Sequence, residues 1–189
     1  MNRRNLLRGL AAGLLVPAGF AGAQFVGKPK AAKAPPSVEA LQRDWKRLLA
    51  SDAKVAADAT PIVKADAEWQ RELDPAAYAV LRHEGTERPF SSPLDDEHRA
   101  GVFACAGCAL PLFTSAMKFD SGTGWPSFFT TIPGVFQTKT DHLIVVARTE
   151  YHCAKCGGHH GHVFDDGPAP TGLRYCNNGV ALRFIPLQV

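Results

Sequence analysis

The 189-residue sequence lacks three features that would each indicate a class of protein. No apolar run approaches the roughly 18 residues needed to cross a bilayer, so we expect no stable membrane span. The sequence also has no net charge outside its first 23 residues. Lys and Arg number 21 against 18 acidic residues, but three of the arginines lie in the first 23 residues, so the net charge of residues 24–189 is 18 − 18 = 0. A basic surface for nucleic acid therefore has no support. No internal repeat is visible beyond two similar Cys-x-x-Cys turns, and 46% hydrophobic residues exclude a disordered polar chain.

The first 23 residues have the three parts of an export signal. Arg3, Arg4 and Arg8 form a basic start, an apolar run covers 9–20, and small residues at 21–23 form a cleavage site. The Arg3-Arg4 pair favours a twin-arginine signal, with an ordinary secretory signal as the alternative. We therefore expect an exported, periplasmic protein.

Residues 24–66 are expected to be a linker followed by a helix. Lysines, prolines and small residues fill 24–36, where nothing can build a core. Ser37 can cap a helix running to about Ala50, with apolar residues on the face that should pack against the domain behind it: Val38, Leu41, Trp45, Leu48 and Leu49. Further helices are predicted around Trp69 and from Asp74-Pro75 to about Leu81.

After His83 the pattern changes to short β-rich runs separated by Gly, Pro and Asp. The predicted strands are 101–104, 143–148, 163–164 and 180–185. In the last, Val180, Leu182 and Phe184 alternate with Ala181, Arg183 and Ile185, which suits a half-buried strand. We expect antiparallel β structure over 84–189, within a mainly β domain over 67–189 that begins with short helices.

Four of the five cysteines form two Cys-x-x-Cys pairs, Cys105 with Cys108 and Cys153 with Cys156. Two such pairs give a closed, structural zinc site of four thiolates. Gly107 and Gly157 are expected where these turns need a permissive backbone. Disulfides among the same residues are the alternative in an exported protein.

The fifth cysteine, Cys176, has no partner by spacing and is a candidate reactive thiol. Arg174 would share its face of an extended strand and favour the thiolate. Alternation after Gly161 places His162 and Phe164 on one face, where a histidine could give a proton to a developing oxyanion. A third segment, 119–128, is a Gly- and Pro-rich loop that presents Trp125.

From about Trp69 to Phe184, the sequence resembles the methionine sulfoxide reductase B family, the peptide-methionine (R)-S-oxide reductases. The resemblance lies in long, ordered motifs: Gly85–Phe90, both cysteine pairs, Pro111–Phe113, Lys118–Phe128, His159–Pro168 and Arg174–Cys176. It implies two antiparallel sheets clipped together by a four-cysteine zinc site remote from the active site.

The resemblance also implies roles for residues. Cys176 would attack the sulfoxide sulfur and become a sulfenic acid, with His162 or His159 helping to protonate the oxygen. Trp125 would pack on the substrate methyl group, and His159, His162 and Asn178 would line the pocket. Arg174 and Asp166 match positions near the catalytic cysteine. The substrates would be oxidised proteins or peptides, and we expect a monomer.

Four positions depart from the family pattern. Thr123 occupies the place where many members have a resolving cysteine, so the sulfenic acid would need an external thiol, for which we expect a thioredoxin-fold donor. Asn177 and His160 stand where apolar residues are common, and Gly179 where Ser is common. The alternatives are a zinc-ribbon binding module, a thiol hydrolase using Cys176 and His162, and a redox sensor without turnover.

Overall fold

The computed structural model describes residues 36–141 and 148–187, and the chain from Pro35 onward forms one unit, to which the following description refers. Its helices and 3-10 turns are α1 (Val38–Arg43), η1 (Trp45–Leu48), α2 (Asp66–Glu72), α3 (Pro75–His83), η2 (Ser115–Met117) and η3 (Gly179–Ala181). Its strands are β1 (Gly101–Cys105), β2 (Pro111–Thr114), β3 (Lys118–Phe119), β4 (Ser127–Phe128), β5 (Phe136–Asp141), β6 (Arg148–Cys153), β7 (His159–Phe164), β8 (Arg174–Asn177) and β9 (Leu182–Pro186). No helix in the described ranges has the length and apolar character needed to cross a membrane.

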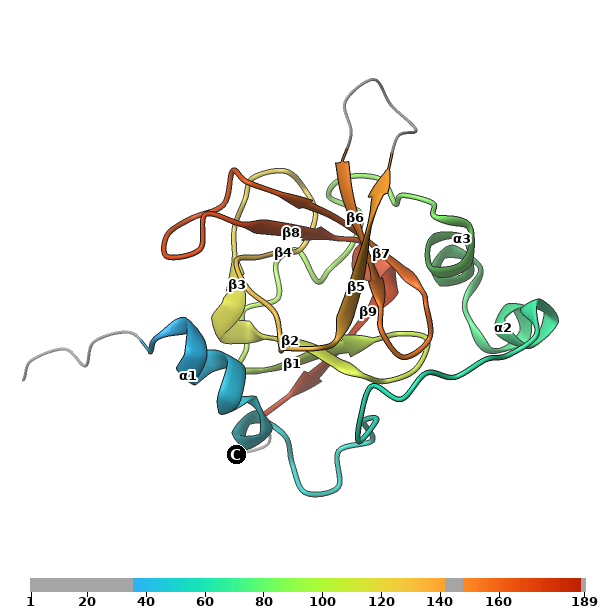
Figure 1. The fold of residues 1–189 in the computed structure, drawn as a ribbon, viewed down its shortest axis with the longest axis horizontal. Helices are drawn as coiled ribbons and strands as arrows, with labels where there is room; N and C mark the ends of the chain where they lie inside the picture. Colours follow the sequence, from blue (N-terminus) through green and yellow to red (C-terminus); the bar gives the residue numbers. More distant parts are fainter. Residues whose placement is uncertain (1–35, 142–147, 188–189) are drawn as a thin grey trace, which may run out of the picture. The chain divides into compact units, whose positions relative to one another are not determined.

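The strands form two sheets, and every pairing is antiparallel. One sheet has the order β2-β1-β9, and the other has the order β3-β4-β8-β7-β6-β5. Figure 1 shows β1 and β2 passing below β4 and β8 in that view. The predicted fold class, mainly β with two antiparallel sheets and short helices, is confirmed.

Aromatic side chains from both sheets form the core between them. The ring of Phe113 on β2 stacks on that of Phe128 on β4 at 3.9 Å between centroids, and Phe103 on β1 meets Phe128 edge-on at 5.1 Å. All three side chains are fully buried. Such contacts between sheets fix how the face of the larger sheet is presented.

The N-terminal helix is shorter than predicted. Ser37 caps it, since its hydroxyl accepts the Ala40 N–H at 3.3 Å, but α1 ends at Arg43 and a 3-10 turn follows. Leu41 and Trp45 pack against the core, as expected of the apolar face. Figure 1 shows α2 and α3 on the opposite side of the sheets from α1.

Two strand predictions need comment. The segment 143–148 lies outside the described residues except for Arg148, which begins β6. The prediction for 180–185 is wrong at its start, because Val180 lies in the η3 turn and β9 begins at Leu182. The reason is a carboxylate 92 residues away in sequence: Glu87 accepts the N–H groups of Gly179 and Val180 at 2.5 and 2.9 Å and holds the turn closed.

Candidate functional site

The strand register places Cys176 near the middle of the six-stranded sheet. β8 lies between β4 and β7, and Cys176 is directly opposite Ser127 on one side and His162 on the other. Directly paired residues point to the same face of a sheet. The thiol and the imidazole therefore share one face, which is also the face of Glu150, the β6 partner of His162.

A β-bulge in β7 brings two histidines to that face. Tyr151 pairs with Gly161 and His152 with His159, so His160 is the extra residue of the bulge. The bulge reverses the alternation, and the rings of His159 and His162 approach to 5.6 Å between centroids. Gly161 is required here, because a Cβ atom at this position would lie 1.9 Å from the carbonyl oxygen of Cys176.

A pocket of about 140 Å³ opens beside the thiol. Five of the residues singled out from the sequence line it: Cys176, His162, Trp125, Asn178 and Phe164. Four further residues line it that the sequence did not single out for this role: Thr86, Arg148, Gly161 and Asn177.

Three expected site residues lie outside this lining. His159 was expected in the pocket wall but is 2% exposed and lies beside His162 rather than on the pocket surface. Arg174 and Asp166 form a bidentate ion pair, with N–O distances of 2.7 and 2.8 Å, and the guanidinium lies 4.3 Å from the Phe164 ring centroid. They therefore act on the thiol from beside the pocket.

Glu87 holds two of the pocket residues in place. Its backbone N–H donates to the Asn178 side-chain oxygen at 2.9 Å, and its carbonyl accepts the Trp125 indole N–H at 3.2 Å. No sequence pattern assigned a role to this residue, although it lies inside the motif 85–90. The one signal for it is an acidic residue between Gly85 and Pro89.

Competing effects set the pKa of Cys176. Burial raises it and is the largest effect, while the nearby Arg174 charge and hydrogen bonds from Thr123 and Arg174 lower it. The expected action of Arg174 is therefore present, but the pKa of the thiol is still raised overall. Arg174 and Thr123 therefore offset part, but not all, of the free energy that burial adds to forming the thiolate.

The hydroxyl of Thr123 belongs to a short chain of hydroxyl groups. Ser121 Oγ lies 2.8 Å from both Thr123 Oγ1 and Ser127 Oγ, and Ser127 donates to the Trp125 carbonyl at 3.0 Å. These hydrogen bonds fix the loop that carries Trp125 relative to the nucleophile.

Two of the departures from the family pattern contact each other. His160 Nδ1 lies 3.2 Å from Asn177 Oδ1, which also accepts the Tyr151 hydroxyl at 2.9 Å, and all three side chains are buried. Burial lowers the pKa of His160 to about 4, so its ring is neutral at pH 7. His160 is therefore part of a buried polar cluster with Asn177 and Tyr151.

Gly179, a further departure, also has a structural reason. A Cβ atom at this position would lie 2.0 Å from the hydroxyl oxygen of Ser92. The Ser92 side chain thus fills the space that a residue larger than glycine would need.

The four paired cysteines converge at the ends of two strands from different sheets. Cys105 ends β1 and Cys153 ends β6, and the ligand atoms of all four lie within 4.8 Å of one another. The sulfurs of Cys105 and Cys156 are 3.6 Å apart and those of Cys108 and Cys153 3.5 Å apart, far longer than the about 2.05 Å of a disulfide.

This arrangement fits a tetrahedral ion. Four sulfurs each about 2.3 Å from one zinc ion would be about 3.8 Å from one another. The pKa of Cys105 is raised, most strongly by hydrogen bonding to Cys108, and further by the other two sulfurs and by burial. Without a metal its thiolate is therefore unfavourable, and a divalent cation would supply the charge that stabilises it. The four-cysteine cluster can therefore hold a metal.

The two turns that carry these cysteines have the same backbone hydrogen bond, but only one of them has its positive φ at the glycine where it was expected. In each, the fifth residue donates its N–H to the first cysteine carbonyl: Ala109 to Cys105 at 2.9 Å and Gly157 to Cys153 at 2.8 Å. Both have positive φ, 61° and 68°. Gly157 matches the expectation, whereas Gly107 has no positive φ and Ala109 takes the left-handed conformation in its place.

Comparison with known proteins identifies the family of the chain. The SelR domain model matches residues 73–186. The peptide methionine sulfoxide reductase MsrB of Bradyrhizobium diazoefficiens is 52% identical over 138 residues, 71% of this chain and 98% of that protein. The proteins of the same name from Leifsonia xyli and Methanosarcina barkeri are 53% identical over 127 residues (66% of this chain, 91% of that protein) and 50% over 124 (65% and 87%). The chain therefore belongs to the MsrB family of peptide methionine sulfoxide reductases.

Proposed function

We propose that this chain reduces the R epimer of methionine sulfoxide in oxidised peptides and proteins, with Cys176 as the nucleophile. It is an oxidoreductase of the peptide-methionine (R)-S-oxide class by its family. The observation that carries the residue assignment is the convergence of Cys176, His162, Trp125 and Asn178 on one pocket.

In the first step, the Cys176 thiolate attacks the sulfoxide sulfur and the sulfoxide oxygen takes up a proton. The oxygen then passes to the cysteine sulfur, the substrate S–O bond and the S–S bond made in the attack both break, methionine leaves as the thioether, and Cys176 becomes a sulfenic acid. The substrate sulfur gains the two electrons that the cysteine loses. His162, opposite Cys176 in the sheet, is the candidate proton donor, with His159 behind it.

The pocket walls suggest how the substrate is held. Trp125 is half-buried and offers an aromatic face to the sulfur-bound methyl group, a favourable contact for sulfur substituents. Phe164 and Asn178 would complete the wall. Arg174, fixed by Asp166, would favour the thiolate by its charge.

An external thiol would complete the cycle. Thr123, rather than a cysteine, lies beside Cys176, and the other four cysteines are gathered in the metal-binding cluster. Two thiol groups of a reductant, for which a thioredoxin-fold protein is the expected source, would convert the sulfenic acid to thiol and water while forming their own disulfide.

We assign the four-cysteine cluster to one structural zinc ion held by Cys105, Cys108, Cys153 and Cys156. Four thiolates leave zinc no open position, so the ion would stabilise the fold and take no part in the reaction. We also propose export to the periplasm through the signal at 1–23, which can be tested by fractionating cells that express the chain with Arg3 and Arg4 changed to Lys.

The deciding experiment supplies purified protein with separated R and S methionine sulfoxide peptides and dithiothreitol. The R peptide should be consumed, and Cys176→Ser should abolish turnover while retaining bound metal. Oxidation of Cys176 without release of methionine would indicate a redox sensor instead, and no turnover of either epimer by metal-loaded protein would exclude the proposed function.

A further inference from the structure

A buried carboxylate lies on the active-site face, two strands from the nucleophile. Glu150 on β6 is opposite His162 on β7, which is opposite Cys176 on β8. Glu150 is 2% exposed. A buried carboxylate is retained in a fold only with partners for its charge, and the identity of those partners indicates what Glu150 does.

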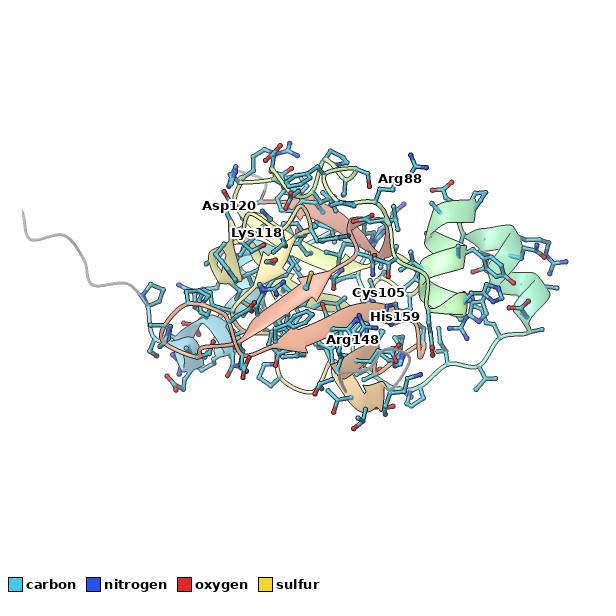
Figure 2. The ribbon with its side chains drawn as sticks, turned by 90° about the horizontal axis from the view of Figure 1, so that it is seen from above. Arg88, Cys105, Lys118, Asp120, Arg148 and His159 are labelled. Atoms are coloured by element: carbon cyan, nitrogen blue, oxygen red, sulfur yellow. The ribbon has the colours of Figure 1, made fainter. Side chains whose placement is uncertain are left out.

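Both carboxylate oxygens are engaged. Oε1 lies 2.5 Å from His159 Nδ1 and 2.7 Å from His152 Nε2, and Oε2 lies 3.2 Å from the Lys139 ammonium group. Lys139 also pairs with Glu84 at the end of α3. His159 is labelled in Figure 2, on the strand next to that of Glu150.

The same contacts argue against a second metal site. Glu150, His152 and His159 have ligand atoms close enough to hold an ion. However, Lys139 already neutralises the carboxylate, and both imidazole nitrogens lie at hydrogen-bonding distance from a single oxygen. Glu150 is therefore best described as a hydrogen-bond acceptor.

This acceptor determines the tautomer of His159. A carboxylate can only accept, so Nδ1 carries the hydrogen and Nε2 is left as the nitrogen that can take up and release a proton. Nε2 is buried and has no hydrogen-bond partner among the described residues. The His159 ring lies beside that of His162, which lines the pocket.

We propose that Glu150 is a positioning residue that fixes the Nδ1–H tautomer of His159 and stabilises its protonated form. His159 then supplies the proton which His162 passes to the sulfoxide oxygen, once substrate binding brings Nε2 within hydrogen-bonding distance of His162. This inference rests on the proposed function. The proton balance is that of the reaction: one proton leaves His159 Nε2, ends on the oxygen retained in the sulfenic acid, and is replaced from solvent.

The charges around His159 agree with this role. It is faced by Glu150 and His152 on β6, His162 on its own strand, Lys139 on β5 and Glu84 at the end of α3. Burial lowers the pKa of His159, and the Glu150 charge and hydrogen bond oppose that effect. Loss of the carboxylate charge should therefore lower the pKa of His159 further.

The test measures kcat/KM for an R-sulfoxide peptide with dithiothreitol between about pH 5 and pH 9, where histidines titrate. In Glu150→Gln, the decline at high pH should move to lower pH, with kcat at pH 8 reduced about 10-fold to 100-fold and KM nearly unchanged. Lys139→Gln should move the decline in the opposite direction, because it removes a positive charge from Glu150. The rate of Cys176 alkylation as a function of pH should stay the same in both variants.

Nitrogen-15 NMR of the histidine rings reads the tautomer without any turnover. His159 should carry its hydrogen on Nδ1 in the parent protein and lose this preference in Glu150→Ala. A Glu150→Gln profile that keeps its position on the pH axis, with activity falling only in proportion to folded protein, would overturn the proposal, as would a second equivalent of metal lost with Glu150. Absence of turnover in the parent protein would instead refute the proposed function.

Discussion

Thr123 stands at the position where many relatives are expected to have a second redox cysteine, and its side-chain hydroxyl lowers the pKa of Cys176, against the larger effect of burial. Thr123 thus acts on the thiol by hydrogen bonding and not as a covalent partner, and the difference has measurable consequences.

Replacing Thr123 by Val keeps the shape of the side chain but removes the hydroxyl. The pKa of Cys176 should rise, because the thiolate loses one hydrogen bond, and a bond worth about 1 kcal/mol corresponds to roughly fivefold less thiolate at pH 7. The rate of alkylation by iodoacetamide measures this directly. Thr123→Ser is the matched control and should react like the parent; equal rates in Thr123→Val would show that the hydroxyl does not act on the thiol.

Arg174 should affect the same thiol through its charge. Arg174→Gln removes a positive charge that lowers the pKa of Cys176, so the alkylation profile should move to higher pH and the rate at pH 7 should fall. Because Arg174 also holds the Asp166 carboxylate, the pKa of Asp166 should return toward its ordinary value. A profile that moves to lower pH would contradict the assigned role.

The close approach of Gly161 to Cys176 predicts a large effect from one methyl group. Gly161→Ala would place a Cβ atom 1.9 Å from the Cys176 carbonyl oxygen, so β7 and β8 must separate. We expect a loss of about 1–3 kcal/mol of unfolding free energy and a loss of activity that exceeds the loss of folded protein. Gly107→Ala is the control, since its Cβ atom would make an ordinary contact at 3.5 Å with Leu81.

The buried contact between His160 and Asn177 predicts coupled mutations. Asn177→Val should destabilise the protein by about 1–3 kcal/mol, because it leaves the buried Nδ1 of His160 without its partner. Adding His160→Leu should recover most of this loss, since the second change removes the group left unpaired. Urea unfolding of the two single variants and the double variant measures the coupling, and strictly additive effects would refute it.

Loss of one sulfur should disrupt the metal-binding cluster. Cys153→Ser is expected to abolish stoichiometric zinc binding and to lower the unfolding free energy by more than about 4 kcal/mol, because an ion bound by the cluster would link two sheets. Metal analysis and thermal unfolding provide the measurements. Cys176→Ser, which removes a sulfur outside the cluster, should retain both metal and stability.

The sequence predicted those features that depend on local patterns. The spacing of the cysteines indicated the cluster, and the Asp74-Pro75 pair indicated the start of α3 at Pro75. The features that were missed depend on residues far apart in the chain. Glu87 closes the η3 turn from 92 residues away, and the bulge at His160 arises from the register of β6 against β7. No local periodicity encodes such contacts.

The position of His159 depends on the same register. Alternation along a regular strand would place His160 on the face of His162, whereas the extra residue of the bulge brings His159 to that face, beside His162. Only the pairing with β6, where the register shifts between Tyr151 and His152, determines which histidines share the face of Cys176.

The position of the cysteine cluster has a practical consequence. Cys105 ends a strand of the three-stranded sheet and Cys153 ends a strand of the six-stranded sheet, and each turn supplies one more sulfur. Neither sheet alone can offer four ligands, so tight coordination would require both to be formed and docked. The metal stoichiometry of a purified sample would therefore count correctly assembled molecules, whatever the oxidation state of Cys176.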